Sequence, residues 1–404
     1  MPRGLTALIS AQFFSALADN ALLIVAIALL AAQGHPAWWA PLLKFAFTVA
    51  YVVLAPFVGP LADAFVKARL MMAMNALKVL GVLALLAGVQ PLAAFALVGV
   101  GAAAYAPAKY GLLTELVPAR QLVAANGWIE VTTVCAAIFG TVLGGLLVSP
   151  LVARWAPAFG TAALDLALLA LLAVYALAAL LNLGVPDSGA RYRRPDIALP
   201  ALWRSFARAQ VRLWRDADGG LSMAVTTLFW GVAAVLQFAV LRWALDRLGL
   251  ALDRAAYLQA VVALGIVGGA ALAGRHVALA QASRLLPLGI ALGVAVPLVA
   301  LVDHWLAALP LLLLIGTLGG ALVVPLNALL QHRGHRLLTA GRSIAVQNFN
   351  ENASVLVMLA AYAGLLALEL DIRAVLALFG GLVAAVMALL WQRDRHRLRA
   401  SALR

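Results

Sequence analysis

Apolar residues run along this chain in stretches of about 20, and short clusters of Gly, Pro and charged residues separate them. Each stretch is long enough to cross about 30 Å of hydrocarbon as a helix. Only helices satisfy the backbone hydrogen bonds of a single segment there. The pattern predicts an all-α integral membrane protein with twelve transmembrane helices. They are placed near residues 5–33, 41–62, 70–89, 92–114, 122–149, 159–184, 220–246, 255–274, 284–303, 305–330, 342–368 and 371–391.

Composition agrees with this pattern. Hydrophobic residues make up 65% of the 404 residues and charged residues only 11%, against about 25% charged in a typical soluble domain. The single cysteine, Cys135, excludes an intramolecular disulfide and a Cys-rich metal site. We expect no metal and no cofactor. The first apolar stretch carries Asp19 and Asn20 and lacks a cleavage site, so it predicts an uncleaved span.

The net charge of +13 marks one side of a membrane rather than a nucleic-acid site, because basic residues gather in alternate turns and in the tail. Lys67 and Arg69 lie in the second of the turns, and seven arginines lie between residues 191 and 215. By the positive-inside rule both termini are cytoplasmic. We expect a multi-pass protein of the bacterial inner (cytoplasmic) membrane.

One long polar stretch, residues 186–219, divides the chain. It predicts an N-terminal six-helix bundle (1–184), a basic cytoplasmic linker (185–219) and a C-terminal six-helix bundle with a basic tail (220–404). Trp203, Trp214 and the spaced arginines of this stretch suit an amphipathic helix on anionic headgroups. A solvated linker without a binding role is the alternative.

The two halves resemble copies at an offset of 218 residues. The matched residues are Gly101, Pro107 and Lys109 with Gly319, Pro325 and Asn327, and Asp19 with Gln237. Asn126 and Glu130 match Gln347 and Glu351 at an offset of 221. Two halves of six spans in the same direction predict a major facilitator architecture, with a site between the halves near the midplane. Chance matches in low-complexity apolar sequence are the alternative.

Seven ionisable residues lie within the predicted spans: Asp19, Lys78, Lys109, Glu130, Asp165, Arg242 and Glu351. Each such group costs at least about 2.5 to 3.5 kcal/mol at the bilayer centre, so each needs a partner or a water-filled cavity. We place Asp19, Glu130 and Glu351 in a central cavity. Salt bridges between helices, or gate contacts, are the alternative for each of them.

Lys109 follows Pro107, a residue that loosens a helix and frees backbone groups for polar ligands. A lysine there is a candidate phosphate partner that acts as a point charge. Pairing with Glu115, or extension toward the cytoplasmic face, is the alternative.

The run Gln347 to Asn352 is unusually polar for an apolar helix and predicts a cavity lining, with helix packing as the alternative. The candidate substrate-binding residues are Asp19, Asn20, Lys78, Tyr105, Lys109, Asn126, Glu130, Gln237, Arg242, Gln347, Asn348, Glu351 and Asn352.

The turn from Gly59 to Arg69 resembles the loop signature of the major facilitator superfamily, although Ala64 stands where a basic residue is usual. The resemblance implies that Asp63, Lys67 and Arg69 act in gating, as a latch against neighbouring helix ends. A simple charged turn is the alternative.

Four further stretches resemble the bacterial lysophospholipid transporter family, LplT, and the likeness covers essentially the whole chain. They are residues 11–23, 105–111, 325–331 and 345–352. The resemblance implies flipping of lysophospholipids, such as lysophosphatidylethanolamine, from the outer to the inner leaflet, for reacylation by a cytoplasmic or membrane-associated acyltransferase. It also implies that Asp19 and Lys109 contact the headgroup. Family members tend to have arginine at Gln237, whereas here Arg242 follows five residues later, about 140° away around the helix.

Other functions fit the residues less well. No histidine has an aspartate five positions later, as an acyltransferase of the usual kind needs, so we do not expect an enzyme. A drug or metabolite exporter of the same fold remains an alternative, as does a scramblase or a scaffold for the acyltransferase, because fold does not fix substrate.

Overall fold

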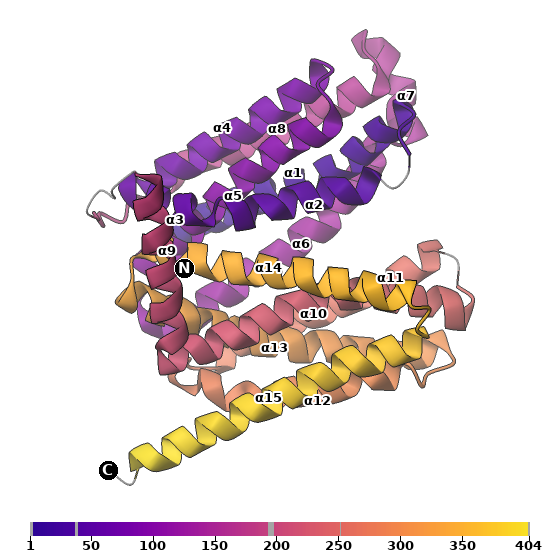
Figure 1. Cartoon of the computed structure of the whole chain (residues 1–404). Coiled ribbons are helices and arrows are strands. Elements are labelled where there is room, and N and C mark those ends of the chain that lie inside the picture. The colour runs from indigo at the N-terminus through magenta and orange to yellow at the C-terminus, as the bar shows by residue number, and fades with distance from the viewer. Residues whose placement is uncertain (1–2, 37–38, 193–197, 251, 403–404) are drawn as a thin grey trace. The chain divides into compact units, whose positions relative to one another are not determined.

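The computed structural model describes residues 3–36, 39–192, 198–250 and 252–402, and Figure 1 shows their helices. No strand occurs within these ranges. In the first part of the chain the helices are α1 (Arg3–Ala32), α2 (Trp39–Val53), α3 (Ala55–Ala64), α4 (Lys67–Leu86), α5 (Pro91–Leu116), α6 (Leu122–Leu147), α7 (Pro150–Trp155) and α8 (Ala163–Leu181). They are followed by α9 (Leu199–Arg215), α10 (Ala217–Leu248), α11 (Leu252–His276), α12 (Leu286–Val299), α13 (Trp305–Leu337), α14 (Ala340–Ala367) and α15 (Ile372–Ala402). Four short 3₁₀ turns complete the set: Ala119–Gln121, Ala156–Phe159, Asn182–Gly184 and Leu279–Leu285.

Among the described residues, eleven helices are long and apolar enough to cross a membrane, or up to twelve if α2 and α3 form one span. The predicted all-α membrane fold is confirmed. The predicted second span, 41–62, is broken, because α2 and α3 meet at an angle of 64°. Pro56 lies at the start of α3, where its missing N–H and its ring prevent the helix of α2 from continuing.

Two helices extend further than their apolar stretches predict. α13 continues to Leu337 and α15 to Ala402, beyond the predicted ends at 330 and 391. Both extensions are rich in Arg, Gln and His, and of these Arg and Gln form helix readily once the chain has left the apolar stretch. Hydropathy marks the hydrocarbon crossing, not the end of the helix.

The chain forms two compact units. Unit one contains residues 1–117, 132–212 and 334–349, and unit two contains residues 118–131, 213–333 and 350–404. Each unit therefore includes one short segment from the other half of the sequence, namely 334–349 in unit one and 118–131 in unit two. These segments end at residues 349 and 131, which differ by 218, the same offset at which the two halves of the sequence match.

The core of unit one is built by α1, α4, α5 and α8, around residues such as Leu22, Val82 and Tyr175. Small residues let α4 and α5 approach closely. A Cβ at Gly81 would lie 2.6 Å from Val98 Cγ2, and one at Gly101 would lie 2.9 Å from Lys78 Cγ. The second contact holds the stem of Lys78 against the backbone of α5.

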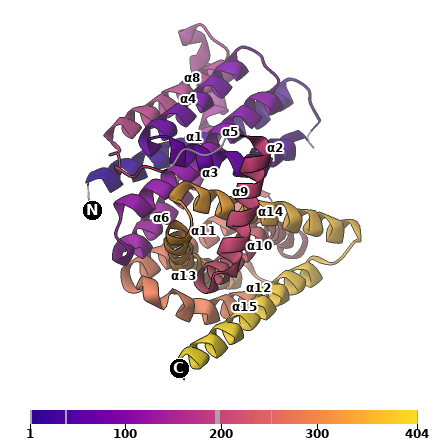
Figure 2. The same cartoon turned by 60° about the vertical axis from the view of Figure 1, so that its left-hand side comes forward.

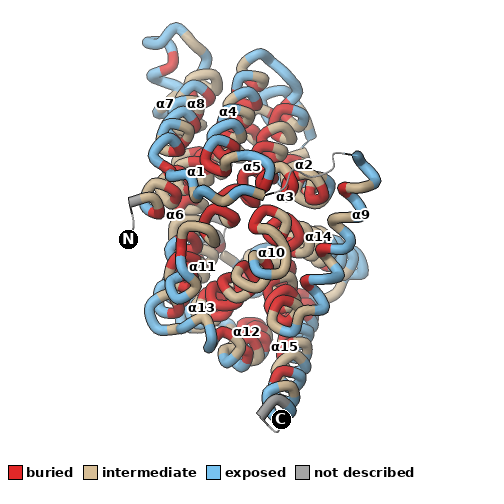
Figure 3. The backbone as a smooth tube through the Cα atoms, turned by 90° about the vertical axis from the view of Figure 1, so that its left-hand side faces the viewer, coloured by how far each residue is buried: buried red, intermediate tan, exposed pale blue. Residues whose placement is uncertain are grey.

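The core of unit two involves α10, α11, α12, α13 and α15. Its largest buried side chains include Trp243 and Phe379, with leucine and valine around them. In Figure 3 buried positions recur along the inner sides of these helices, while exposed positions cover their outer sides. Many of the exposed side chains are large and apolar, as expected for helices that face lipid.

Candidate functional site

A buried ion pair joins α1 to α4 in unit one. Lys78 Nζ lies 2.6 Å from Asp19 Oδ2, and the exposed fractions of the two side chains are 2% and 15%. The same ammonium donates a hydrogen bond to Ser15 Oγ at 3.0 Å. Ser15 in turn donates to Asn75 Oδ1 at 2.8 Å. Hydrogen bonds thus link four polar residues of two apolar helices, while Asn75 Nδ2 is buried without a hydrogen-bond partner among the described residues.

Two tyrosines complete this cluster. The Tyr175 hydroxyl of α8 donates to Asp19 Oδ1 at 2.7 Å. The Lys78 ammonium lies 5.3 Å from the ring centroid of Tyr105 and 5.9 Å from that of Tyr175. Both distances are within the range of a cation–π contact. The cluster of Ser15, Asp19, Asn75, Lys78, Tyr105 and Tyr175 is termed the α1–α4 polar cluster below.

Because the Asp19–Lys78 pair is buried, its stability depends on the contacts that compensate for lost hydration. Transfer of two ions from water costs several kcal/mol each, and their attraction offsets this only with good geometry and further hydrogen bonds. Here the carboxylate accepts from two donors, and the ammonium has one carboxylate, one hydroxyl and aromatic rings around it. The two side chains therefore stay paired unless another charged group binds to one of them. A ligand ammonium can take the place of Lys78 on Asp19, and a ligand anion can take the place of Asp19 on Lys78.

Ser15, Asn75 and Tyr175 were not among the predicted site residues. Two of them could have been found by spacing, because Ser15 lies four residues before Asp19 and Asn75 three residues before Lys78. Residues three and four apart share one face of a helix. Tyr175 has no local signal, since it is joined to Asp19 only by the packing of α8 on α1.

The remaining predicted residues of the first half are placed as follows. Lys109 and Glu130 are buried, and the Lys109 ammonium lies 4.1 Å from the ring centroid of Tyr110. Asn20 donates to the Ala16 carbonyl of its own helix at 2.8 Å. Neither Asn20 nor Lys109 belongs to the α1–α4 polar cluster.

In unit two, Asn126 of α6 and Gln331 of α13 exchange two hydrogen bonds between their amides, of 2.8 and 2.9 Å. Both residues are buried. Near them α6 approaches α11 closely, because a Cβ on Gly127 would lie 3.0 Å from the Ala270 carbonyl and 3.3 Å from Gly274 Cα. The amide pair itself joins α6 to α13 and satisfies two buried side chains that would otherwise be costly there.

Gln237 and Arg242 lie on α10 and are exposed. The Gln237 carbonyl accepts a hydrogen bond of 2.6 Å from Gln259, and Arg242 is ion-paired with Asp246 at 3.1 Å, one turn further along α10. Arg242 therefore has a local acidic partner.

The polar run of α14 is largely buried. Gln347, Asn348 and Glu351 have exposed fractions of 5%, 9% and 8%, and Asn352 is half-buried. Asn350, in the same run, accepts a hydrogen bond of 3.2 Å from Trp214 Nε1. This concentration of buried polar groups distinguishes α14 from the other apolar helices.

Asp63 at the end of α3 binds the N-terminus of α14 within unit one. Its carboxylate accepts hydrogen bonds from the Thr339 hydroxyl, from the Gly341 N–H at 2.8 Å and from the Arg342 N–H at 3.3 Å. The first N–H groups of a helix have no partner within the helix, and a negative charge there is favourable. Asp63 therefore caps α14 from another part of the chain, and this contact is termed the Asp63 clasp.

Small residues make the Asp63 clasp possible. A Cβ on Gly59 would lie 2.9 Å from Ala345 Cβ, and one on Gly341 would lie 2.6 Å from the Gly59 carbonyl oxygen. Larger side chains at these positions would hold α3 away from α14.

Lys67 forms a second buried contact beside the clasp. Its ammonium lies 2.7 Å from Glu115 Oε1, with exposed fractions of 3% and 4%, and 4.8 Å from the Tyr192 ring centroid. Glu115, the alternative partner considered for Lys109, also accepts from the hydroxyls of Ser188 and Tyr192. Burial and the Glu115 carboxylate raise the pKa of Tyr192. Arg69 is exposed and takes no part in this contact.

Comparison with known proteins decides the family. The Major Facilitator Superfamily profile matches residues 8–357. The chain belongs to this superfamily.

The fold of the chain is also similar to solved transporter structures. A human organic anion transporter, MFSD10, has a TM-score of 0.73 at 16% identity and covers 96% of this chain and 100% of its own. The outward conformation of FucP also has a TM-score of 0.73 at 16% identity, covering 96% and 97%.

Curated relatives place the chain within the superfamily. A protein of Citrobacter koseri named lysophospholipid transporter LplT is 43% identical over 398 residues, which cover 98% of this chain and 97% of the relative. An Escherichia coli protein of the same name is 43% identical over 396 residues, covering 98% and 96%. The chain is therefore a member of the LplT family, as its motifs predict. Members of this superfamily are multi-pass membrane transporters, and the helices of this chain fit that architecture.

Proposed function

We propose that this LplT family member transports lysophospholipids, such as lysophosphatidylethanolamine, from the outer to the inner leaflet of the bacterial inner membrane. The observation that carries the proposal is 43% identity along nearly the whole chain to proteins named lysophospholipid transporters. The likeness covers 98% of this chain, so it extends over both halves of the sequence.

The chemistry of the substrate suits the α1–α4 polar cluster. A lysophospholipid has one acyl chain, which can stay against apolar helix surfaces, so only its headgroup needs a polar route. Asp19 and Lys78 carry the two charges that complement an ammonium and a phosphate. Opening this pair for a zwitterionic headgroup replaces one set of charge contacts by another, so the net change in electrostatic energy is small.

Lys109 is the second cation of this route and acts as a phosphate partner, because a lysine ammonium tolerates a headgroup that moves past it. The other proposed substrate-binding residues are also polar or charged: Asn20, Tyr105, Asn126, Glu130, Gln237, Arg242, Gln347, Asn348, Glu351 and Asn352. The burial of Glu130 and Glu351 in apolar helices supports their inclusion, because such groups need a functional or structural partner.

Gating rests on the Asp63 clasp and the Lys67–Glu115 contact. A capping interaction contributes about 0.5 to 2 kcal/mol, which is enough to bias a conformational equilibrium and small enough to be reversed in each cycle. Arg69 acts through its charge beside them. The gathering of Lys and Arg in alternate turns and in the tail supports cytoplasmic termini, and this topology puts the clasp on the cytoplasmic side. Delivery to that side makes a cytoplasmic or membrane-associated acyltransferase the expected partner.

A reconstituted flipping assay tests the proposal. Purified protein is placed in liposomes with fluorescent lysophosphatidylethanolamine in the outer leaflet, and the label that an impermeant quencher reaches is followed over time, with and without a pH gradient. We expect a protein-dependent loss of accessible label. A rate equal to that of protein-free vesicles contradicts the function, and export of unrelated organic compounds without lysolipid movement identifies a drug or metabolite exporter.

Two variants test the residues in the same assay. Asp19→Asn and Lys109→Ala are expected to lower the rate at least about tenfold, the effect of losing about 1.4 kcal/mol of charge-assisted contact. Asp303→Asn is the matched control, because Asp303 is 80% exposed in a loop. Unchanged rates in both site variants, at equal protein amount, would leave the function standing and refute the site.

A further inference from the structure

The amphipathic helix α9 has three distinct sides. Leu202, Ala209 and Leu213 are buried and lie on one side, because seven and eleven residues are close to two and three helical turns. The other two sides are exposed (Figure 3). No acidic residue occurs anywhere in the helix.

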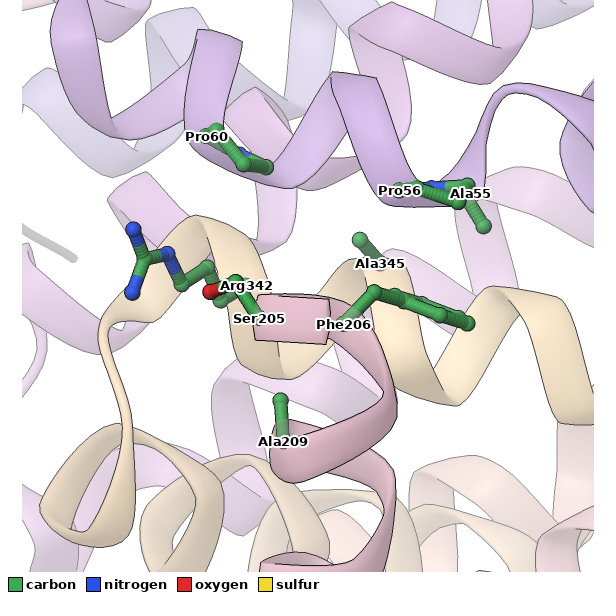
Figure 4. Close-up of a pocket in the computed structure, with 8 residues that line it drawn as sticks. All are labelled: Ala55, Pro56, Pro60, Ser205, Phe206, Ala209, Arg342 and Ala345. Carbon is green, nitrogen blue, oxygen red and sulfur yellow. The ribbon is translucent and has the colours of Figure 1, made fainter. Parts of the chain in front are cut away.

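The buried side of α9 packs on both elements of the Asp63 clasp. Figure 4 shows Ser205, Phe206 and Ala209 of α9 facing α3 and the start of α14 across a small, largely apolar pocket. The lining from those two elements is Ala55, Pro56, Pro60, Arg342 and Ala345. Phe206 lies edge-on to Phe349 of α14, with ring centroids 5.2 Å apart. The helix is thus fixed to unit one by one face.

The two exposed sides differ in chemistry. At about 100° per residue, Trp203 and Trp214 fall close together on one flank, whereas the arginines fall on the opposite flank. The four arginines, at 204, 208, 212 and 215, are all exposed. Within the described part of the chain no carboxylate forms an ion pair with any of them. Four exposed arginines therefore line one flank. The two tryptophans of the other flank are about half-exposed and also contact the protein, because the Trp203 ring lies edge-on to Phe57 with centroids 6.2 Å apart and Trp214 Nε1 donates to Asn350 Oδ1 at 3.2 Å.

The chain holds α9 beside a membrane crossing. Asp216 alone separates it from α10, which is long and apolar enough to span. Asp216 also caps α10, through a hydrogen bond of 2.8 Å from the Gly219 N–H, and is ion-paired with Arg333 at 2.5 Å. This fixed junction leaves α9 no freedom to move far from the bilayer surface.

We propose that the exposed sides of α9 form a binding surface for anionic phospholipid headgroups. Trp at the interface and Arg on phosphate are the side chains typical of helices that lie in the headgroup layer. Each arginine near an anionic surface strengthens binding about fivefold, so four of them form a substantial site. This surface is distinct from the proposed substrate site at the α1–α4 polar cluster, because it lies on a different helix.

Binding there connects lipid charge to the clasp. Since the buried side of α9 covers α3 and the start of α14, headgroups that hold α9 in place also favour the closed arrangement of the Asp63 clasp. Lysophospholipid flipping, where the proposed function holds, then depends on the content of anionic lipid.

A fluorescence experiment on the full chain tests the surface without reliance on transport. An environment-sensitive dye is attached at Ala207→Cys, an exposed position on the tryptophan flank, in a Cys135→Ser background. The protein is placed in nanodiscs of phosphatidylcholine, with or without phosphatidylglycerol. We expect a blue shift with phosphatidylglycerol that high salt reverses, because salt screens exposed charges.

Two sets of substitutions provide the decisive comparison. Arg204→Gln, Arg208→Gln, Arg212→Gln and Arg215→Gln together are expected to weaken the phosphatidylglycerol response at least about tenfold. Arg154→Gln with Arg247→Gln, both exposed and outside α9, are expected to leave it unchanged. The proposal is overturned if the dye signal is equal in the two lipid mixtures, or if the variant with all four Arg→Gln substitutions in α9 keeps the full phosphatidylglycerol response. Both outcomes hold whether or not the protein transports lysolipid.

Discussion

Replacing Lys78 by methionine isolates the energetic role of the buried pair. Methionine has a similar length and no charge, so Lys78→Met keeps most of the volume next to Gly101 and removes the ammonium. Asp19 then keeps only the hydrogen bond from Tyr175. The Ser15 hydroxyl loses its donor as well.

The expected cost follows from burial. Removing one partner of a buried ion pair typically costs about 3 to 5 kcal/mol, because the other charge is left without compensation. Lys78 is almost fully buried, but the Asp19 side chain retains 15% exposure, which lets water reach its carboxylate. We therefore expect the lower end of this range, about 3 kcal/mol. Asp19→Asn in the same background removes the uncompensated charge and is expected to restore at least about 2 kcal/mol of it.

The assay compares apparent unfolding midpoints of the wild type, the two single variants and the double variant in one detergent. We expect both single variants to be clearly less stable and the double variant to be more stable than Lys78→Met alone. A double variant as unstable as the sum of the singles would show that the two residues do not interact. A Lys78→Met protein within about 0.5 kcal/mol of the wild type, the range of ordinary surface substitutions, would refute the reasoning on burial.

Three further predictions concern the helix ends and contacts. Asp63→Ala removes the cap of α14, so labelling of a cysteine placed near its N-terminus is expected to rise. Arg154→Gln, an exposed position outside the clasp, is expected to leave labelling unchanged, and equal labelling in both variants contradicts the clasp. Gly127→Leu places a side chain against the Ala270 carbonyl, and a loss of about 1 to 3 kcal/mol is expected from the unfolding midpoint, with no loss counting against the close contact. Arg333 and backbone hydrogen bonds lower the pKa of Asp216, so its contribution is present above the ordinary value and disappears as pH falls below it. The difference in midpoint between wild type and Asp216→Asn is therefore expected to be constant from pH 8 to pH 5, and a marked decline within that interval contradicts it.

Much of the fold could be predicted because hydropathy acts locally. Spans of about 20 apolar residues define crossing helices by themselves, and the helices found match the predicted ranges closely. The break between α2 and α3 escaped prediction, although Pro56 and Pro60 were visible in the sequence. Proline inside a membrane helix is often tolerated, so its presence does not decide between a kink and a break.

The site was less accessible to sequence reasoning. The cost of burying charge singled out Asp19 and Lys78 separately, but their pairing depends on how α4 packs against α1. Tyr175 joins them from a third helix, more than 150 residues away along the chain from Asp19. Partner choice among buried charges is a tertiary property, and the headgroup-binding roles of the candidate residues stay predictions.

The two close crossings, Gly59 with Ala345 and Gly127 with Gly274, differ from the polar contacts beside them in how they separate. Small apolar surfaces leave no orphaned donor or acceptor when they part, and they bury little area. The Asp63 hydrogen bonds join α3 to α14 at the first crossing, whereas the Asn126–Gln331 amides join α6 to a third helix, α13, beside the second crossing. Separation of α3 from α14 would therefore expose the Asp63 carboxylate and the first N–H groups of α14, and water or a ligand would have to satisfy both.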